Sequence, residues 1–82
     1  MYEGILAEIR LFAGTFAPNG WAYCDGSTMA IMQNQALFSL IGTQFGGDGQ
    51  KTFQLPNLPP VKAGNAEIRY IICLQGIYPQ RD

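Results

Sequence analysis

The stretch from residue 13 to residue 26 most constrains what this chain can fold into. It reads AGTFAPNGWAYCDG and contains three aromatic residues, three glycines and one proline, with Asp25 as its single charge. Aromatic side chains carry a large hydrophobic area, while glycine and proline mark turns. Such a stretch predicts a tightly folded segment that forms much of the core rather than a solvated linker.

The length and charge of the chain limit how much of it can be buried. The 82 residues are 48% hydrophobic and only 13% charged, whereas an average domain is about 25% charged. A chain of this size forms one domain, here residues 1–82, and buries only about 60–65% of its unfolded surface. We therefore expect some apolar surface to meet other subunits. The alternative is a compact monomer with glycines and amides on its surface.

Alternating apolar residues, bounded by glycine and proline turns, predict four short strands. The last of them is almost continuously apolar after Arg69, which is typical of a strand that is buried on both faces. The predicted strands are Ile5–Phe12, Trp21–Cys24, Thr52–Leu55 and Glu67–Leu74.

One short helix is predicted over residues 35–41. Asn34 is a favourable N-cap residue, and Gly42 follows the last apolar residue, where helices often stop. Three apolar side chains recur at i, i+3 and i+4 and give the helix one apolar face: Leu37, Leu40 and Ile41. The fold class is therefore α+β, mainly β, with short strands and one helix.

The first predicted strand is half-buried, with Glu8 and Arg10 on its polar face. Its AEIR sequence at residues 7–10 recurs at residues 66–69, where the last strand opens. Opposite charges across two strands favour pairing, so the two strands could lie side by side with Glu against Arg. The alternative is that the repeat is a coincidence.

The sequence lacks the residues that most catalytic and metal sites need. It contains no histidine, which excludes serine–histidine and cysteine–histidine nucleophiles. Cys24 and Cys73 are too far apart in sequence for metal-ligand spacing. They are expected to be buried free thiols, with a single disulfide as the alternative. The prediction is a protein that is not an enzyme, with no cofactor and no metal.

The sequence also shows no signature of phosphate binding, nucleic-acid binding or membrane insertion. Residues 46–52 read GGDGQKT, but a phosphate-binding loop has glycine where Gln50 stands, so a plain turn is expected. With a net charge of −1 and scattered basic residues, nucleic acid is not an expected partner. No apolar run reaches the roughly 18 residues that cross a membrane, so membrane insertion is not expected.

Four residues could form a ligand surface. Trp21 and Tyr23 are two apart and share a face of a strand, where they could stack on a sugar ring, although core packing is the alternative. Asp25 and Asp48 stand among glycines. Each could contribute to binding, but an isolated Asp beside glycine more often stabilises a turn.

A long series of motifs in fixed order covers much of the chain. It consists of EIRLFAG at 8–14, FAP at 16–18, GWAYCDG at 20–26, Asn34, ALFSLIGT at 36–43, FGGDG at 45–49, TFQLPNL at 52–58 and YIICLQGIYP at 70–79. In these segments the chain resembles the phage tail collar domain family, including tail fibre proteins of the microcystin-dependent-protein type. The resemblance implies a structural protein of a phage tail or tail-like particle. It also implies oligomers, often trimers, and no enzymatic activity.

The chain departs from the family pattern after residues 55–58 (LPNL). The family usually continues with Arg-Gly-Arg and a long glycine-rich variable region, whereas here residues 59–65 lead directly to the last strand. The resemblance therefore implies the scaffold that packs and oligomerises, without the distal region expected to contact a receptor.

The predicted function is a self-associating structural subunit of a tail fibre, collar or tail-derived filament. It would be made in the bacterial cytoplasm and be extracellular after release, as a trimer or helical polymer, with other tail proteins as further partners. An unpaired edge strand would provide hydrogen bonds for assembly. The alternative is a receptor- or carbohydrate-binding adhesin module that uses Trp21, Tyr23, Asp25 and Asp48. The predicted assembly residues are Ile5, Ala7, Ile9, Leu11, Ile68, Tyr70, Ile72 and Leu74.

Overall fold

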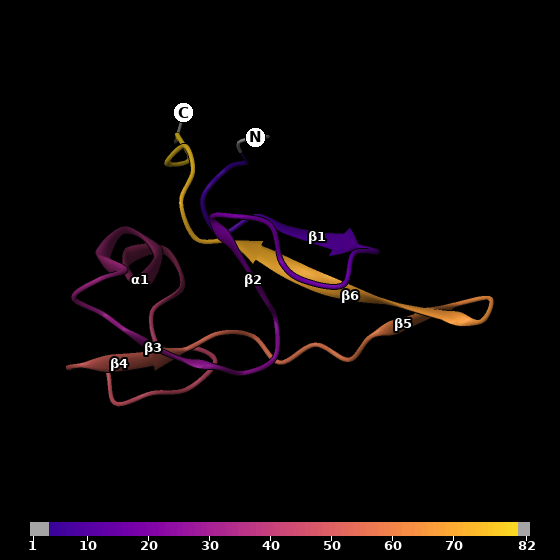
Figure 1. Cartoon of the computed structure of the whole chain (residues 1–82). Coiled ribbons are helices and arrows are strands. Elements are labelled where there is room, and N and C mark those ends of the chain that lie inside the picture. Colours follow the sequence, from indigo (N-terminus) through magenta and orange to yellow (C-terminus); the bar gives the residue numbers. More distant parts are fainter. Residues whose placement is uncertain (1–3, 81–82) are drawn as a thin grey trace.

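The computed structural model of the chain describes residues 4–80 and confirms a mainly β fold with one short helix (Figure 1). Within these residues, strands β1 to β3 precede helix α1, and β4 to β6 follow it. The elements are β1 Ile9–Phe12, β2 Trp21–Tyr23, β3 Thr28–Ala30, α1 Gln35–Ile41, β4 Thr52–Gln54, β5 Val61–Ala63 and β6 Ala66–Cys73.

Strand β6 organises the larger of two antiparallel sheets. Strand β1 pairs along one side of β6 and β2 pairs along the other, while β5 pairs with the beginning of β6. The smaller sheet joins β3 to β4. The predicted last strand is confirmed, and its residues 71–73 are fully buried, as the continuous apolar run indicated.

The core lies on both faces of β6 because alternate β6 side chains point to opposite sides. On one side, Ile72 joins Leu37 of α1 and Phe53 of β4 in the main cluster, and the rings of Phe38 and Phe53 lie 5.4 Å apart. On the other side, Trp21 packs with two β6 residues in a second cluster. Stretch 13–26 therefore contributes to both clusters, through Cys24 and Trp21.

Helix α1 has the predicted bounds, and Gly42 ends it by donating its N–H to the Phe38 carbonyl at 2.8 Å. The Asn34 side chain, however, does not cap the helix. Its Nδ2 donates instead to the Ala30 carbonyl at 2.9 Å, which ties the start of the helix to the end of β3.

The hairpin of β5 and β6 projects from the body as an arm (Figure 1). All residues from 61 to 67 are exposed, and the molecule measures 41 × 27 × 23 Å. Its radius of gyration is 13.1 Å, larger than the roughly 12 Å of a compact chain this long. The arm turns at Gly64, whose φ of 63° is in the left-handed region. Strands β5 and β3 were not predicted.

The prediction for the first strand was wrong in both length and orientation. Ala7 has a φ of 72° and sits in a turn closed by the Glu8 N–H donating to the Ile5 carbonyl at 2.9 Å, so the strand begins at Ile9. Ile9 and Leu11 are exposed, while the side chains on the other face are half-buried. The covered face is the one with Arg10 and Phe12, because these two side chains pack on the Trp21 cluster.

The repeated AEIR segments do open paired strands, but the predicted Glu–Arg contacts are absent. Strand β1 pairs antiparallel with β6, and the register places Phe12 opposite Arg69 and Arg10 opposite Ile71. Glu8 instead contacts Arg10 of its own segment. The register follows the apolar residues, since Ile9 lies opposite Ile72.

Candidate assembly surface

The larger sheet carries an uncovered apolar face, which we call the apolar sheet face and define as Ile9, Leu11, Val61, Ile68 and Tyr70. The register joins them, since Leu11 lies opposite Tyr70 and Val61 opposite Ile68. The exposed fractions of Ile9, Leu11 and Val61 are 40%, 49% and 38%, and the other two side chains are half-buried. The face thus runs from the edge of the sheet onto the arm.

The remaining predicted assembly residues add little exposed surface to this face. Ile72, opposite Ile9, is only 1% exposed and belongs to the main core. Ala7, Tyr70 and Leu74 are partly buried and pack against the same core. A role of Ala7, Ile72 and Leu74 in assembly stays a prediction. Ile5 is 50% exposed but lies apart, in a bridge with Ile77 of the C-terminal segment.

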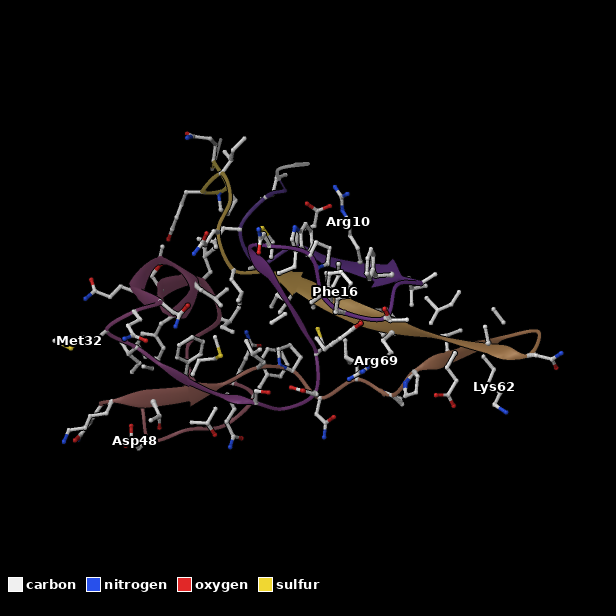
Figure 2. All side chains as sticks on the ribbon, in the orientation of Figure 1. Arg10, Phe16, Met32, Asp48, Lys62 and Arg69 are labelled. Carbon is white, nitrogen blue, oxygen red and sulfur yellow. The ribbon has the colours of Figure 1, made fainter. Side chains whose placement is uncertain are left out.

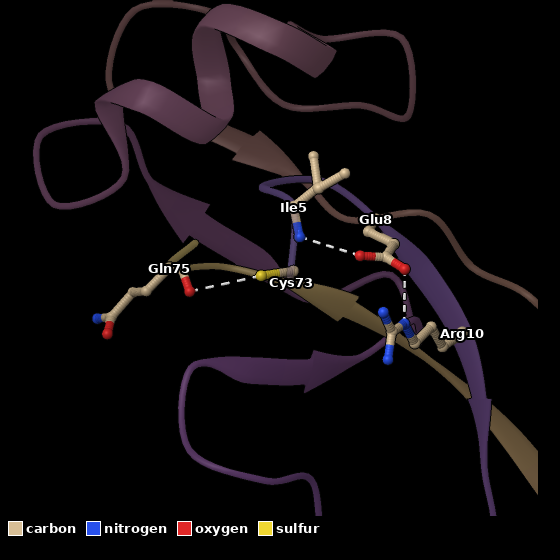
Figure 3. A network of polar contacts seen from close by, with 5 residues as sticks. All are labelled: Ile5, Glu8, Arg10, Cys73 and Gln75. Atoms are coloured by element: carbon tan, nitrogen blue, oxygen red, sulfur yellow. Dashed lines mark hydrogen bonds and ion pairs between the residues drawn. The ribbon is translucent and has the colours of Figure 1, made fainter. Parts of the chain in front are cut away.

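A charged pair lies at the start of β1, between Arg10 of the strand and Glu8 just before it (Figure 3). The Glu8 carboxylate accepts from Arg10 Nε at 2.6 Å and from the Ile5 N–H at 2.9 Å. These hydrogen bonds, the one from Arg10 foremost, lower the pKa of Glu8. The Arg10 guanidinium also lies over the Trp21 ring, 5.6 Å from its centre.

The two aromatic residues proposed for ligand stacking are covered. Trp21 is 8% exposed and packs in the second core cluster. Tyr23 is half-buried, with the Arg69 guanidinium 3.7 Å from its ring centre and its hydroxyl donating to the Gly14 carbonyl at 3.3 Å. The predicted core packing describes these rings better than a sugar platform does.

Both aspartates stabilise turns. Asp25 Oδ1 accepts from the backbone N–H and the hydroxyl of Ser27. Asp48 Oδ1 accepts three backbone N–H groups within 3.0 Å, and these bonds lower the pKa of Asp48 to about 2. The structure does not bring the four candidate ligand residues together, because Trp21 and Tyr23 lie on β2, while Asp48 lies in the loop before β4.

Both cysteines are free and buried. Cys24 lies in the main core, and burial, with a smaller effect of the Asp25 charge, raises the pKa of its thiol to about 11. Cys73 lies in the second cluster and its Sγ donates to the Gln75 carbonyl at 3.4 Å (Figure 3).

Between residues 4 and 80, no three potential metal ligands come together. None of the helices in this range is long and apolar enough to cross a membrane.

Sequence reasoning missed Val61, which completes the apolar sheet face on the arm. The signal was present, because Gly64-Asn65 between Val61-Lys62-Ala63 and the last strand is a two-residue hairpin turn. Phe16 and Met32 were also missed as exposed apolar side chains, at 75% and 84% exposure (Figure 2).

The comparisons with known proteins give one match. The sequence pattern of the phage tail collar domain matches residues 7–60, which extend from the turn before β1 to the residue before β5. No curated protein and no solved structure matches the chain significantly. The matched region includes the Trp21 cluster, α1 and β4, and it covers more than half of the 82 residues. The chain therefore belongs to the phage tail collar domain family, a structural family of phage tails.

Proposed function

We propose that this chain is a non-enzymatic structural subunit of a phage tail or tail-like particle, and that it self-associates through the apolar sheet face. The observation that carries the proposal is the exposure of Ile9, Leu11 and Val61 on one sheet of a small, charge-poor domain. A contiguous apolar patch on such a domain indicates a protein interface.

Covering the apolar sheet face would contribute several kcal/mol of hydrophobic free energy to assembly. Full burial of a large aliphatic side chain stabilises by about 1.5–3 kcal/mol. Ile9, Leu11 and Val61 are two-fifths to half exposed, so each contributes roughly 1 kcal/mol when a neighbour covers it. An interface in which two copies cover each other doubles this gain, and backbone pairing adds to it.

We propose that the assembled protein is part of a tail or tail-like particle, and that it acts neither as a free enzyme nor in a complex with nucleic acid. We propose a homo-oligomer, a trimer or a helical polymer, that is made in the bacterial cytoplasm, joins other tail proteins and is extracellular after release. The receptor- or carbohydrate-binding alternative would need a surface other than Trp21 and Tyr23, because core residues and Arg69 cover these rings.

The experiment measures native mass and particle shape for the wild type and for Leu11→Glu, with Met32→Glu as the matched control. Met32 is an exposed apolar residue distant from the arm (Figure 2), so both variants exchange an exposed apolar side chain for a carboxylate. Size-exclusion chromatography with light scattering and negative-stain imaging are expected to show oligomers for the wild type and the control, and monomers for Leu11→Glu. Far-UV circular dichroism checks that all three are folded. A wild type that stays monomeric at tens of micromolar would overturn the proposal.

A further inference from the structure

The arm has one side that carries all of its charges and one side that carries none. Alternate residues of a strand point to opposite sides of the sheet. Lys62 lies opposite Glu67, and Arg69 follows two residues later on the same side. The residues on the other side are all apolar: Val61, Ala63, Ala66 and Ile68. Such alternation is typical of a sheet that has one face covered and one face in water.

Within residues 4–80, the subunit does not cover the apolar side of the arm. Residues 61–67 are all exposed, and the hairpin projects from the body (Figure 1). A two-stranded hairpin by itself is only marginally stable in water. The apolar side continues into Leu11 and Tyr70 of the apolar sheet face, two residues farther along β6 than Ile68. The arm therefore needs a cover from outside the subunit, and an uncharged one, because this side offers no charge to a charged partner.

The size of the side chains changes steadily along this apolar surface. Pairs of residues that lie opposite each other form three successive rungs, each two β6 residues from the next. From the tip of the arm toward the body, the rungs are Ala63–Ala66, Val61–Ile68 and Leu11–Tyr70. They are small, intermediate and large in that order. A surface graded in this way fits a copy of itself that runs in the opposite direction, because the small rung then meets the large one and few voids are left.

We infer that the arms of two copies pack reciprocally, the apolar side of each arm lying on the apolar sheet face of the other copy. The inference rests on the proposed self-association and names its contact. A two-fold axis passes through the middle rung, so Val61 and Ile68 meet their own equivalents. Ala66 of each copy then lies over Tyr70 of the other. This is an isologous contact between two stacked sheets, and it covers the two outer rungs as well as the middle one.

Charge and size both favour this arrangement over others. Packing through the opposite side of the arm would bury Lys62 and Glu67, which is costly, whereas stacking through the apolar side leaves both in water. A three-fold arrangement around an axis along the strands would bring each rung against its own equivalents. The three Leu11–Tyr70 rungs would then be crowded while the alanine rungs left a gap, and both effects are unfavourable. The contact therefore makes a dimer, and a second, different contact would join dimers into a polymer.

Crosslinking between two single-cysteine variants tests the direction of stacking. In the proposed dimer, position 66 faces position 70 of the other copy across stacked sheets, about 10 Å away at Cα. The two residues at position 66 are displaced by a further ~14 Å along the strands. With a short bis-maleimide, Ala66→Cys mixed with Tyr70→Cys is expected to give a covalent heterodimer, identified by intact mass, and either variant alone little dimer. Buried Cys24 and Cys73 do not compete in the folded protein. Covalent dimers of Ala66→Cys alone, as abundant as the heterodimer, would overturn the two-fold stacking.

A cysteine at the axis gives an independent measurement. The two residues at position 68 face each other in the proposed dimer, so Ile68→Cys alone is expected to crosslink. Tyr70 packs partly against the main core, and the Ile68→Cys experiment keeps the test valid if Tyr70→Cys fails to fold. Far-UV circular dichroism checks the folding of each variant. A folded Ile68→Cys that assembles without forming a covalent dimer would overturn the position of the axis.

Two neighbouring residues on opposite sides of the arm provide a matched pair of variants. Ala63→Gln places an amide on the apolar side, and Lys62→Gln places the same side chain on the charged side. Burying an unpaired amide is unfavourable, so Ala63→Gln is expected to raise the dissociation constant of the dimer about 10-fold or more, the equivalent of about 1.4 kcal/mol. Lys62→Gln should leave the dissociation constant nearly unchanged. Sedimentation velocity measures both, and equal effects would show that the apolar side of the arm is not the contact.

The outcomes separate reciprocal arm packing from the proposed function. If the wild type is monomeric at tens of micromolar, the proposed function itself fails. If the wild type assembles, but neither the mixed variants nor Ile68→Cys give a covalent dimer, the copies join through another surface. Reciprocal arm packing is then overturned while self-association stands.

Discussion

The guanidinium of Arg69 lies 3.7 Å from the centre of the Tyr23 ring. The two residues are diagonal neighbours on one face, because Tyr23 is opposite Ile71 in the pairing of β2 with β6. The cation covers a ring that would otherwise meet water, and the ring in turn packs against the Trp21 cluster. This contact joins the base of the arm to the body.

Removing the Arg69 side chain should therefore destabilise the subunit. A cation over an aromatic ring contributes about 0.5–1 kcal/mol at an exposed site, so Arg69→Ala is expected to lower the free energy of unfolding by that amount. Lys62→Ala removes a cation farther along the same arm and should change stability less. Guanidinium denaturation monitored by circular dichroism measures both. Equal effects of the two variants would show that the ring contact does not stabilise the fold.

Truncating a side chain in the main core should lower the free energy of unfolding more than removing the Arg69 side chain does. Leu37 and Ile72 are each 1% exposed, and removing such a side chain to alanine costs about 2–5 kcal/mol. The same experiment on Leu11, which is 49% exposed, should cost much less in a monomeric background. Denaturant unfolding of the three variants gives the comparison. A cost for Leu37→Ala below about 0.5 kcal/mol, the usual range of surface changes, would mean that the core is placed wrongly.

Asp48 makes stability depend on acid pH. Its pKa in the folded protein is about 2, below the ordinary 3.8, because three backbone N–H groups bind the charged form. The unfolded chain thus takes up the proton first. The stabilisation is fully present above about pH 4 and is lost as pH falls toward about 2. Thermal melts in this range should fall less steeply for Asp48→Asn than for the wild type. Parallel curves would contradict the assignment.

Glycines 47 and 64 form a matched pair for a steric test. Both have positive φ, at 100° and 63°, so alanine strains the backbone at either position by about 1–2 kcal/mol. A Cβ at Gly47 would also lie 2.7 Å from the Thr52 carbonyl oxygen, whereas one at Gly64 meets nothing within 4 Å. Gly47→Ala should therefore be the more destabilising variant in thermal unfolding. The reverse order would refute the tight approach of loop 46–51 to β4.

The two thiols should be inert in the folded protein. Cys24 is 3% exposed with its pKa raised to about 11, and Cys73 is fully buried. An ordinary thiol, with a pKa of about 8.5, is partly ionised at mild alkaline pH and reacts with iodoacetamide. Mass spectrometry is expected to find neither cysteine alkylated under native conditions and both alkylated in denaturant. Rapid labelling of the native protein would place a thiol at the surface.

Local patterns predicted the elements better than their orientation. The helix bounds followed from helix-forming residues that end at Gly42, and β6 from its apolar run, because these signals lie within a few residues. Alternation in β1 showed which side chains share a face but not which face is covered. Which face is covered depended on Trp21, which is nine or more residues away in sequence and has the Arg10 guanidinium over its ring.

Only part of the apolar sheet face could be predicted, because burial by residues distant in sequence leaves no local signal. Ile9 and Leu11 were named from their pattern and do lie exposed, yet Ile72, named with them, is needed by the core around Phe53. No local signal separates an apolar residue that contacts its own domain from one that contacts another. Val61 was missed although the glycine at position 64 marked the hairpin.

The arm also gives this small domain a place for new sequence. Its tip at Gly64-Asn65 is exposed, and the hairpin projects away from the body (Figure 1). Lengthening a loop raises its closure entropy only slowly. Peptides or whole domains inserted there would extend outward without disturbing the interior. The hairpin is therefore a natural display site, at which related chains could acquire recognition modules while the scaffold stays constant.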